Sequence, residues 1–133
     1  MTNSMLTNKE PVKVLVIEDN EGDAFLVKEL LERQKEQAFN VTSVNNIKEA
    51  SEITKLNKFS VLILDLDLPD GKGFNTFTKA KEIVPDVPIL ILSGSTLKRD
   101  EFRKCLDGAK DYLVKGYLSS DSLAKSILNA IKS

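Results

Sequence analysis

The sequence predicts an α/β fold in which a parallel sheet carries helices on both faces. Five apolar runs, at residues 12–17, 39–44, 61–64, 88–92 and 111–114, alternate with segments whose apolar residues recur at helical spacing. Runs 61–64 and 88–92 are apolar throughout, which is typical of strands buried on both faces of a parallel sheet. Because the 133 residues contain no repeat or linker, we expect a single domain.

The composition excludes several classes of function. With 19 basic and 20 acidic residues the formal net charge is −1, which argues against a nucleic-acid partner. The chain has no histidine and one cysteine, Cys105, so Ser-His or Cys-His catalysis, histidine-ligated zinc and an intramolecular disulfide are excluded. No stretch resembles a signal peptide or a membrane helix, so we expect a cytoplasmic protein whose residues 1–11 form a flexible leader.

The first predicted helix, residues 21–35, has a clear amino-terminal signal. Asn20 can cap it, and Asp23 places a negative charge in the first turn, where the helix dipole favours one. Four apolar residues share its core-facing side: Ala24, Val27, Leu30 and Leu31. The β-branched, alternating run 39–44 then predicts a strand nearer the edge of the sheet.

Four more helices are predicted along the rest of the chain. The pair Asn46 and Glu49 resembles a capping box and opens a polar helix over residues 46–58. The next helix ends at Pro85, another begins near Leu97, and the last begins near Asp121. The apolar residues expected to face the core in these three are Phe74, Phe77, Ala80, Val84, Phe102, Cys105, Leu106, Ala109, Leu123, Ile127, Ala130 and Ile131.

A carboxylate stands at the end of the central strand. Asp65 directly follows run 61–64, and Pro69, Gly71 and Gly73 then turn the chain away from the sheet. Open α/β sheets bind their ligands outside the carboxyl ends of the strands. Asp65 is therefore the first candidate for a reactive group.

Other strands should bring polar groups to the same edge. These groups are Glu18 and Asp19 after the first strand, Ser93 after the fourth and Lys115 after the fifth. Converging carboxylates raise one another's pKa unless a cation lies among them, and oxygen ligands suit Mg²⁺. Lys115 and Ser93 would then form a pocket for a phosphoryl group, with Asp65 as the nucleophile.

Each of these residues alone has a simpler interpretation. Acidic residues after strands are usually turn formers or helix caps, as we interpret Asp70, and a lone lysine is usually solvated. Five compatible groups at the ends of the correct strands favour the functional interpretation of the set.

In this combination the residues closely resemble the receiver domain of bacterial two-component response regulators. The resemblance covers residues 12–131 and implies a flavodoxin-like, doubly wound five-stranded sheet in the order 2-1-3-4-5, with residues 12–133 as the receiver domain. Glu18 and Asp19 match the family's acidic pair. Asp65 matches its phosphoacceptor and is followed by the family's proline and glycine.

The resemblance also implies roles at the last strands. Ser93 matches the family's hydroxyl and Lys115 its lysine, while Tyr112 matches the aromatic residue that switches with Ser93. Gly116 departs from the family, which usually has a proline after the lysine.

By the same resemblance, Asp19, Asp65 and the backbone carbonyl of Asp67 would bind Mg²⁺, with Glu18 contributing through water. A histidine kinase, a histidine phosphotransfer protein or a small acyl phosphate would donate the phosphoryl group to Asp65. The implied function is a phosphorylation-dependent signalling switch acting on a downstream protein, as a monomer or a weak phosphorylation-linked dimer. It would not be a turnover enzyme, and it would bind neither nucleic acid nor membrane directly.

Parts of the sequence also resemble two other functional classes. Residues 65–68, D-L-D-L, resemble the motif of haloacid-dehalogenase-type phosphatases, but they lie in the middle of the chain and the acidic pair precedes them. A receiver-like module that binds partners without phosphorylation is the second alternative. The complete set of acidic, hydroxyl and lysine residues argues against it.

Overall fold

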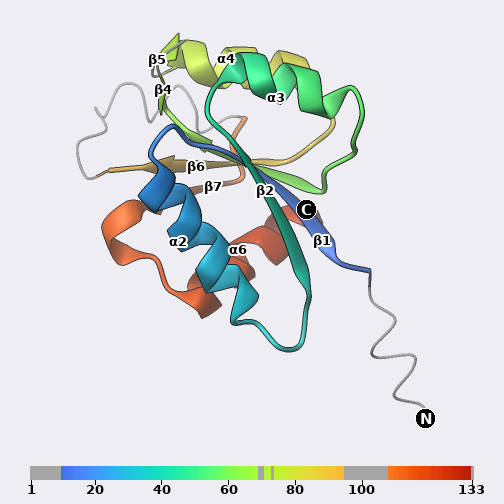
Figure 1. Ribbon diagram of the computed structural model, residues 1–133, viewed down its shortest axis with the longest axis vertical. Helices are drawn as coiled ribbons and strands as arrows, with labels where there is room; N and C mark the ends of the chain where they lie inside the picture. The colour runs from blue at the N-terminus through green and yellow to red at the C-terminus, as the bar shows by residue number, and fades with distance from the viewer. Residues whose placement is uncertain (1–9, 69–70, 73, 95–107, 133) are drawn as a thin grey trace.

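The computed structural model describes residues 10–68, 71–72, 74–94 and 108–132 and confirms the α/β architecture (Figure 1). One five-stranded sheet is built from β1 (Val12–Ile17), β2 (Phe39–Val44), β3 (Val61–Asp65), β6 (Ile89–Ser93) and β7 (Asp111–Val114). The strand order is β2-β1-β3-β6-β7 and every pair is parallel. The expected order is therefore confirmed, and β2 lies at an edge as its alternating sequence predicts.

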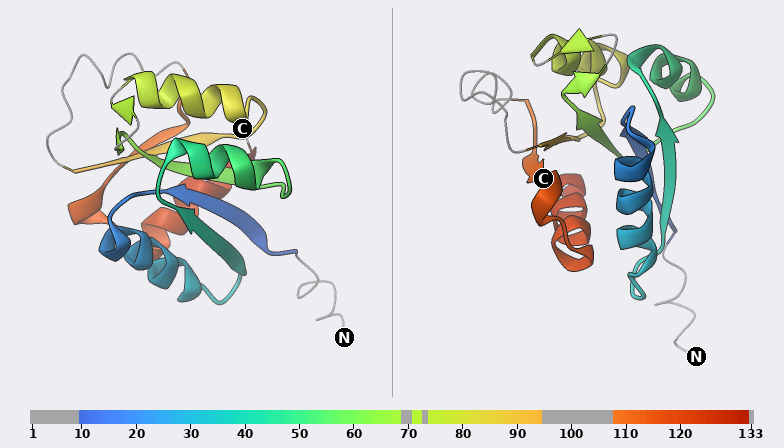
Figure 2. Two further views of the ribbon diagram at one scale, coloured as in Figure 1. Left: turned by 45° about the horizontal axis from the view of Figure 1, so that its top comes forward. Right: turned by 60° about the vertical axis from the view of Figure 1, so that its left-hand side comes forward.

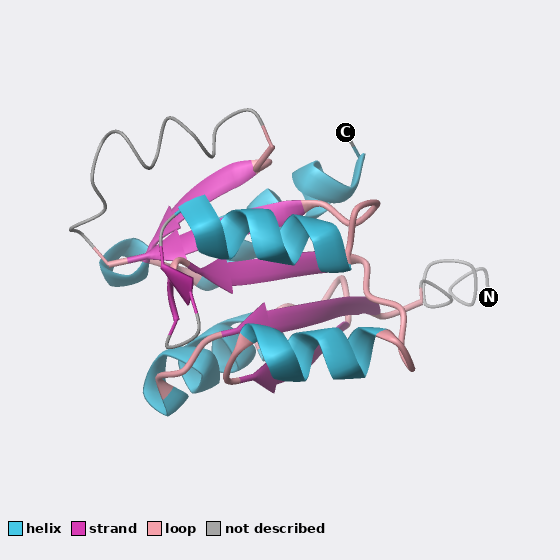
Figure 3. Cartoon of the chain, turned by 90° about the horizontal axis from the view of Figure 1, so that it is seen from above, coloured by secondary structure: helices cyan, strands magenta, loops and turns pink. Residues whose placement is uncertain are grey.

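Helices cover both faces of this sheet. Helices α2 (Glu21–Glu32) and α6 (Ser120–Lys132) lie together on one face, and α3 (Ile47–Thr54) and α4 (Phe74–Ile83) lie together on the other (Figure 2). Seen from above, α3 and α4 run over the strands while α2 and the last helix lie beyond them (Figure 3). The sheet is therefore the middle layer of three. Its two faces are covered by helices, and the connecting loops lie at the ends of its strands.

The middle strands are buried on both sides because their residues alternate between two hydrophobic clusters. Val61 and Ile63 pack toward α2 and α6, whereas Leu62 and Leu64 pack toward α3 and α4. All four side chains are at most 2% exposed. Burying one large aliphatic side chain contributes about 1.5–3 kcal/mol, so these strands supply much of the driving force for folding.

Two helices end earlier than the sequence indicates. α2 ends at Glu32 instead of residue 35. Just after this end, the backbone amide of Gln34 donates a hydrogen bond to the Leu31 carbonyl, which forms a tighter turn than that of an α-helix. α3 ends at Thr54 instead of residue 58. At this end the Thr54 hydroxyl donates hydrogen bonds to the backbone carbonyls of Ala50 and Ser51. Such side-chain bonds compete with the helical backbone pattern and favour its termination.

The predicted helix caps at Asn20 and Asn46 are confirmed, with a small difference at the second. Asn46 Oδ1 accepts a hydrogen bond from the Glu49 amide at 2.8 Å, but Glu49 Oε1 accepts from the Asn45 amide, one residue before the cap. The prediction for Ile131 was wrong. It is 39% exposed, whereas its neighbour Ala130 in the same turn of α6 is buried in the core.

The predicted turn after Asp65 contains a short hairpin that the sequence did not indicate. β4 (Asp67–Leu68) and β5 (Gly71–Lys72) pair antiparallel before α4 begins. The helix expected near Leu97, including Cys105, lies outside the described residues. Among the described helices, none has the length and apolar character needed to span a membrane.

Candidate functional site

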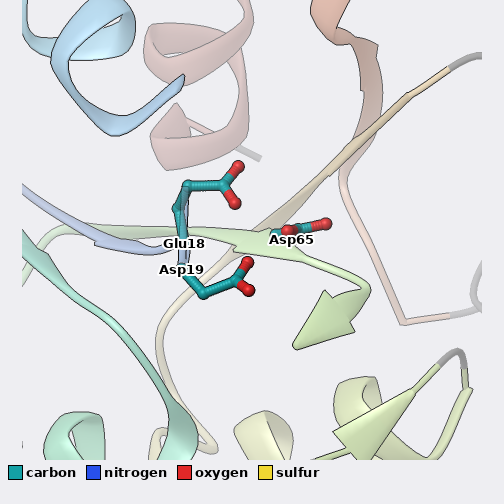
Figure 4. A group of neighbouring side chains, drawn as sticks. All are labelled: Glu18, Asp19 and Asp65. Carbon is teal, nitrogen blue, oxygen red and sulfur yellow. The ribbon is translucent and has the colours of Figure 1, made fainter. Parts of the chain in front are cut away.

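Three carboxylates meet at the carboxyl edge of the sheet. β1 pairs with β3 so that Ile17 lies opposite Leu64, and the next residues along the strands are Glu18 and Asp65. One oxygen from each of Glu18, Asp19 and Asp65 lies within 4.8 Å of the others. Figure 4 shows the first two side chains extending from the end of β1 toward the side on which Asp65 lies. The predicted convergence of the acidic residues is present in the structure.

These carboxylates differ in their exposure to solvent. Glu18 is 1% exposed and Asp65 is 4% exposed, whereas Asp19 is exposed. Burial raises the pKa of Glu18 to about 7, and the adjacent Asp65 carboxyl adds to this rise while Lys115 opposes it. The raised pKa means that the charged form of Glu18 is disfavoured, because burial and the neighbouring Asp65 carboxyl outweigh the ion pair with Lys115.

Lys115 lies among these acidic groups. Its Nζ atom is 2.7 Å from Glu18 Oε1, 2.8 Å from Asp23 Oδ2 and 3.6 Å from Asp65 Oδ2. Burial favours a lower pKa for the Lys115 ammonium, but its contacts with Asp23 and Glu18 outweigh this effect and raise the pKa above its ordinary value. Lys115 therefore stays charged, and its position beside Asp65 agrees with the sequence prediction.

One buried oxygen of the cluster is incompletely satisfied. Glu18 Oε2 accepts a hydrogen bond from the Asn20 amide at 3.2 Å. Glu18 Oε1 makes the 2.7 Å ion pair with Lys115, but that contact lacks hydrogen-bond geometry, and no other donor reaches the atom among the described residues. Buried carboxylate oxygens normally accept hydrogen bonds or ligate metals.

This set of residues fits a hard cation. All the candidate ligand atoms are carboxylate oxygens, and the buried Glu18 Oε1 among them has only the Lys115 ammonium as a partner within the described residues. Exposed Asp19 leaves one side open to solvent. Mg²⁺ prefers such oxygen ligands and keeps part of its water shell. Asp67 begins β4 two residues after Asp65, and a contribution from its carbonyl stays a prediction.

The two predicted switch residues lie on the neighbouring strands. Ser93 ends β6, one residue beyond the pairing of Leu92 with Asp65, and is buried. Its hydroxyl donates a 2.9 Å hydrogen bond to the Gly94 carbonyl. Tyr112 is half-buried on β7 and packs against the hydrophobic cluster beneath α3 and α4.

Sequence reasoning missed Asp23 as a partner of Lys115. The sequence indicates only an acid in the first turn of α2, which usually interacts with the helix dipole. Asp23 and Lys115 are 92 positions apart, so their contact depends on the crossing of α2 over the sheet. No short motif carries that information.

Comparison with known proteins gives the relatives of this chain. A family model described as the response regulator receiver domain matches residues 14–128. Cell cycle response regulators CtrA of Brucella ovis and Brucella canis are each 32% identical to the chain over 114 residues, which is 86% of this chain and 48% of the relative. The chain therefore spans about half the length of the curated relatives it matches.

Solved structures agree in fold. A receiver domain protein of Clostridium thermocellum is 28% identical, with a TM-score of 0.76 over 91% of this chain and 94% of that chain. A receiver domain protein of Methanospirillum hungatei JF-1 is 19% identical, with a TM-score of 0.78 over 92% of this chain and 95% of that chain, and shares the fold. With the matched family model covering most of its length, the chain belongs to the response regulator receiver domain family.

Proposed function

We propose that this receiver domain accepts a phosphoryl group on Asp65 and signals through the conformational change that follows. One observation carries the proposal, namely that a buried Asp65 shares its strand end with Glu18, Asp19 and the ammonium of Lys115. Carboxylates form aspartyl phosphates when nearby positive charge stabilises the transferring group. Membership of the receiver family supports a role in two-component signalling.

The proposed reaction is a phosphoryl transfer. A carboxylate oxygen of Asp65 attacks phosphorus, forming an O–P bond as the N–P bond of a donor phosphohistidine breaks. The donor nitrogen keeps the electron pair and takes up a proton from solvent. A small acyl phosphate would react similarly, with its O–P bond breaking and a carboxylate leaving. Lys115 would stabilise the charge on the phosphoryl oxygens through charge-assisted hydrogen bonds.

Glu18, Asp19 and Asp65 are the residues that would hold Mg²⁺, together with the predicted carbonyl of Asp67. When bound, Mg²⁺ would neutralise negative charge on the cluster and on the phosphoryl oxygens. The Oε1 atom of buried Glu18 supports this proposal, because the Lys115 ammonium is its one partner among the described residues and a carboxylate oxygen can accept a further cation.

The signalling step is proposed to involve Ser93 and Tyr112. In the structure the Ser93 hydroxyl donates to the Gly94 carbonyl, and a phosphoryl oxygen on Asp65 would be a stronger, charged acceptor. Rotation of Ser93 toward that oxygen would leave space for the half-buried Tyr112 ring to turn inward. The changed surface would then alter affinity for a downstream protein by population shift.

Histidine kinases and histidine phosphotransfer proteins are the proposed donors, because receiver domains of this family interact with them. The proposal expects one phosphoryl group per chain and no sustained turnover of phosphomonoesters. Steady hydrolysis of a phosphomonoester by the purified protein would favour the phosphatase alternative instead.

The test is labelling with acetyl phosphate, followed by intact-mass measurement with Mg²⁺ and with EDTA. Wild type should gain one phosphate only with Mg²⁺, and Asp65→Asn should gain none. Asp86→Asn is the matched control, since Asp86 is an exposed aspartate outside the acidic cluster and should leave labelling intact. An unlabelled wild type would contradict the proposal and favour an interaction module that acts without phosphorylation.

A further inference from the structure

The contact between Asp23 and Lys115 is not explained by helix capping. Asn20 Oδ1 accepts a hydrogen bond from the Asp23 amide at 2.9 Å, so the backbone of this turn already has its cap. The Asp23 carboxylate instead accepts a 2.8 Å hydrogen bond from Lys115 Nζ. Its side chain remains 34% exposed, so it approaches the ammonium from the solvent side of the site.

The Lys115 ammonium is held from two directions. Buried Glu18 lies on its inner side at 2.7 Å, and Asp23 lies on its outer side at 2.8 Å. Between them the ammonium rests 3.6 Å from Asp65 Oδ2, just beyond hydrogen-bonding distance. An ammonium has three N–H donors, and a lysine stem has four rotatable bonds. With Glu18 as its single close partner, the ammonium would be held less firmly and could adopt more orientations.

The two partners of Lys115 have different relations to the acidic cluster. Glu18 belongs to the three carboxylates that could hold a cation, whereas Asp23 is outside that group. A cation among the three would draw charge from Glu18 and weaken its hold on Lys115. Asp23 would keep its full charge for the ammonium in that state.

We infer that Asp23 is a positioning residue, which holds Lys115 so that one of its N–H donors reaches a phosphoryl oxygen entering at Asp65. The inference rests on the proposed function and adds a residue on α2 to its machinery. A misplaced ammonium stabilises the transferring group poorly, and displacements near 1 Å cost up to about 100-fold in rate. Because Glu18 still holds the ammonium, we expect about a tenfold slower phosphorylation for Asp23→Ala.

The experiment measures the initial rate of labelling by acetyl phosphate at saturating Mg²⁺. Glu21→Ala is the matched control because Glu21 lies in the same first turn of α2 and is exposed. Both substitutions remove one negative charge from that turn, but only Asp23 touches Lys115. Asp23→Asn keeps an acceptor oxygen without the charge and should restore part of the rate, whereas Glu21→Ala should stay within about twofold of wild type.

A second comparison isolates the route through Lys115. In a Lys115→Met background, Asp23→Ala should cause no further loss of rate, because the group it positions is absent. The full tenfold loss in that background would overturn the inference, since Asp23 would then act on the donor or the cation. Equal rates for Asp23→Ala and wild type would also overturn it, while leaving the proposed function intact. Failure of wild type to label at all would overturn both.

Discussion

Along β3, Ile63 and Asp65 are two positions apart and almost equally buried, yet they are surrounded by different chemistry. Ile63 lies among aliphatic side chains of the sheet and of α2 and α6. Asp65 lies beside two other carboxylates and the ammonium of Lys115. The same strand therefore gains stability in its interior and carries concentrated charge at its carboxyl end.

This difference indicates which region serves folding and which serves function. Burying aliphatic surface is favourable at every interior position, whereas burying a carboxylate near others is unfavourable without a compensating cation. Functional sites commonly retain such unfavourable arrangements at a cost in stability. Substitutions in the two regions should consequently change stability in opposite directions.

The largest expected loss comes from the interior. Ile63→Ala removes buried methyl and methylene groups from a side chain with no exposure and should lower the free energy of unfolding by about 2–5 kcal/mol. Urea unfolding followed by circular dichroism measures this change. A loss below about 1 kcal/mol would mean that the interior of β3 is not tightly packed.

A glycine before β7, which faces the hydrophobic cluster on the other side of the sheet, should give the next largest loss. A Cβ atom at Gly108 would lie 2.6 Å from Cζ of the buried Phe77 ring, so Gly108→Ala forces a shift in the core and should cost about 1–3 kcal/mol. The substitution should cost much less in a Phe77→Leu background. An equal cost in both backgrounds would show that the ring is not the cause.

A gain in stability is expected at the carboxyl edge. Asp65→Asn removes one of three neighbouring carboxylates while keeping the side-chain shape, and without metal it should stabilise the protein by about 1 kcal/mol. The comparison is made by urea unfolding in EDTA. A clear loss of stability would contradict the view that this edge carries uncompensated negative charge.

The smallest effect is expected at Gly116, where the receiver family usually has proline. A Cβ atom there would meet no other atom within 4 Å, so Gly116→Ala should change the free energy of unfolding by less than about 0.5 kcal/mol. The thermal unfolding of Gly116→Ala is compared with that of Gly108→Ala, because both substitutions add one methyl group. A similar loss in the two variants would mean that the loop after β7 is more crowded than the structure indicates.

The interior could be predicted from the sequence because its signals are local. Uninterrupted apolar runs located the two most buried strands, and the boundaries of Phe39–Val44 and Asp111–Val114 were confirmed to the residue. The end of α3 was placed too late because hydroxyl bonds of Thr54 to the helix backbone compete with continuation, and propensity alone does not reveal them. Helical spacing placed Ile131 toward the core, whereas the structure buries Ala130 of the same turn and leaves Ile131 exposed.

The site was predictable only in part. Parallel strands place their carboxyl ends together, so the meeting of Glu18, Asp19 and Asp65 followed from topology. The position of Asp23 against Lys115 could not be predicted from topology, because it depends on the angle at which α2 crosses the sheet. The order of the strands was implied by family resemblance, since the alternation of elements alone does not determine it.

The most direct test of the charged edge is the effect of Mg²⁺ on unfolding. Wild-type stability in urea should rise with Mg²⁺, by about 2.7 kcal/mol at 100 times the dissociation constant. The gain should shrink in Asp65→Asn, by about 1.3 kcal/mol for a tenfold loss of affinity, and should persist in Asp86→Asn. No gain in wild type, or an equal gain in wild type and Asp65→Asn, would contradict a cation site formed by these carboxylates.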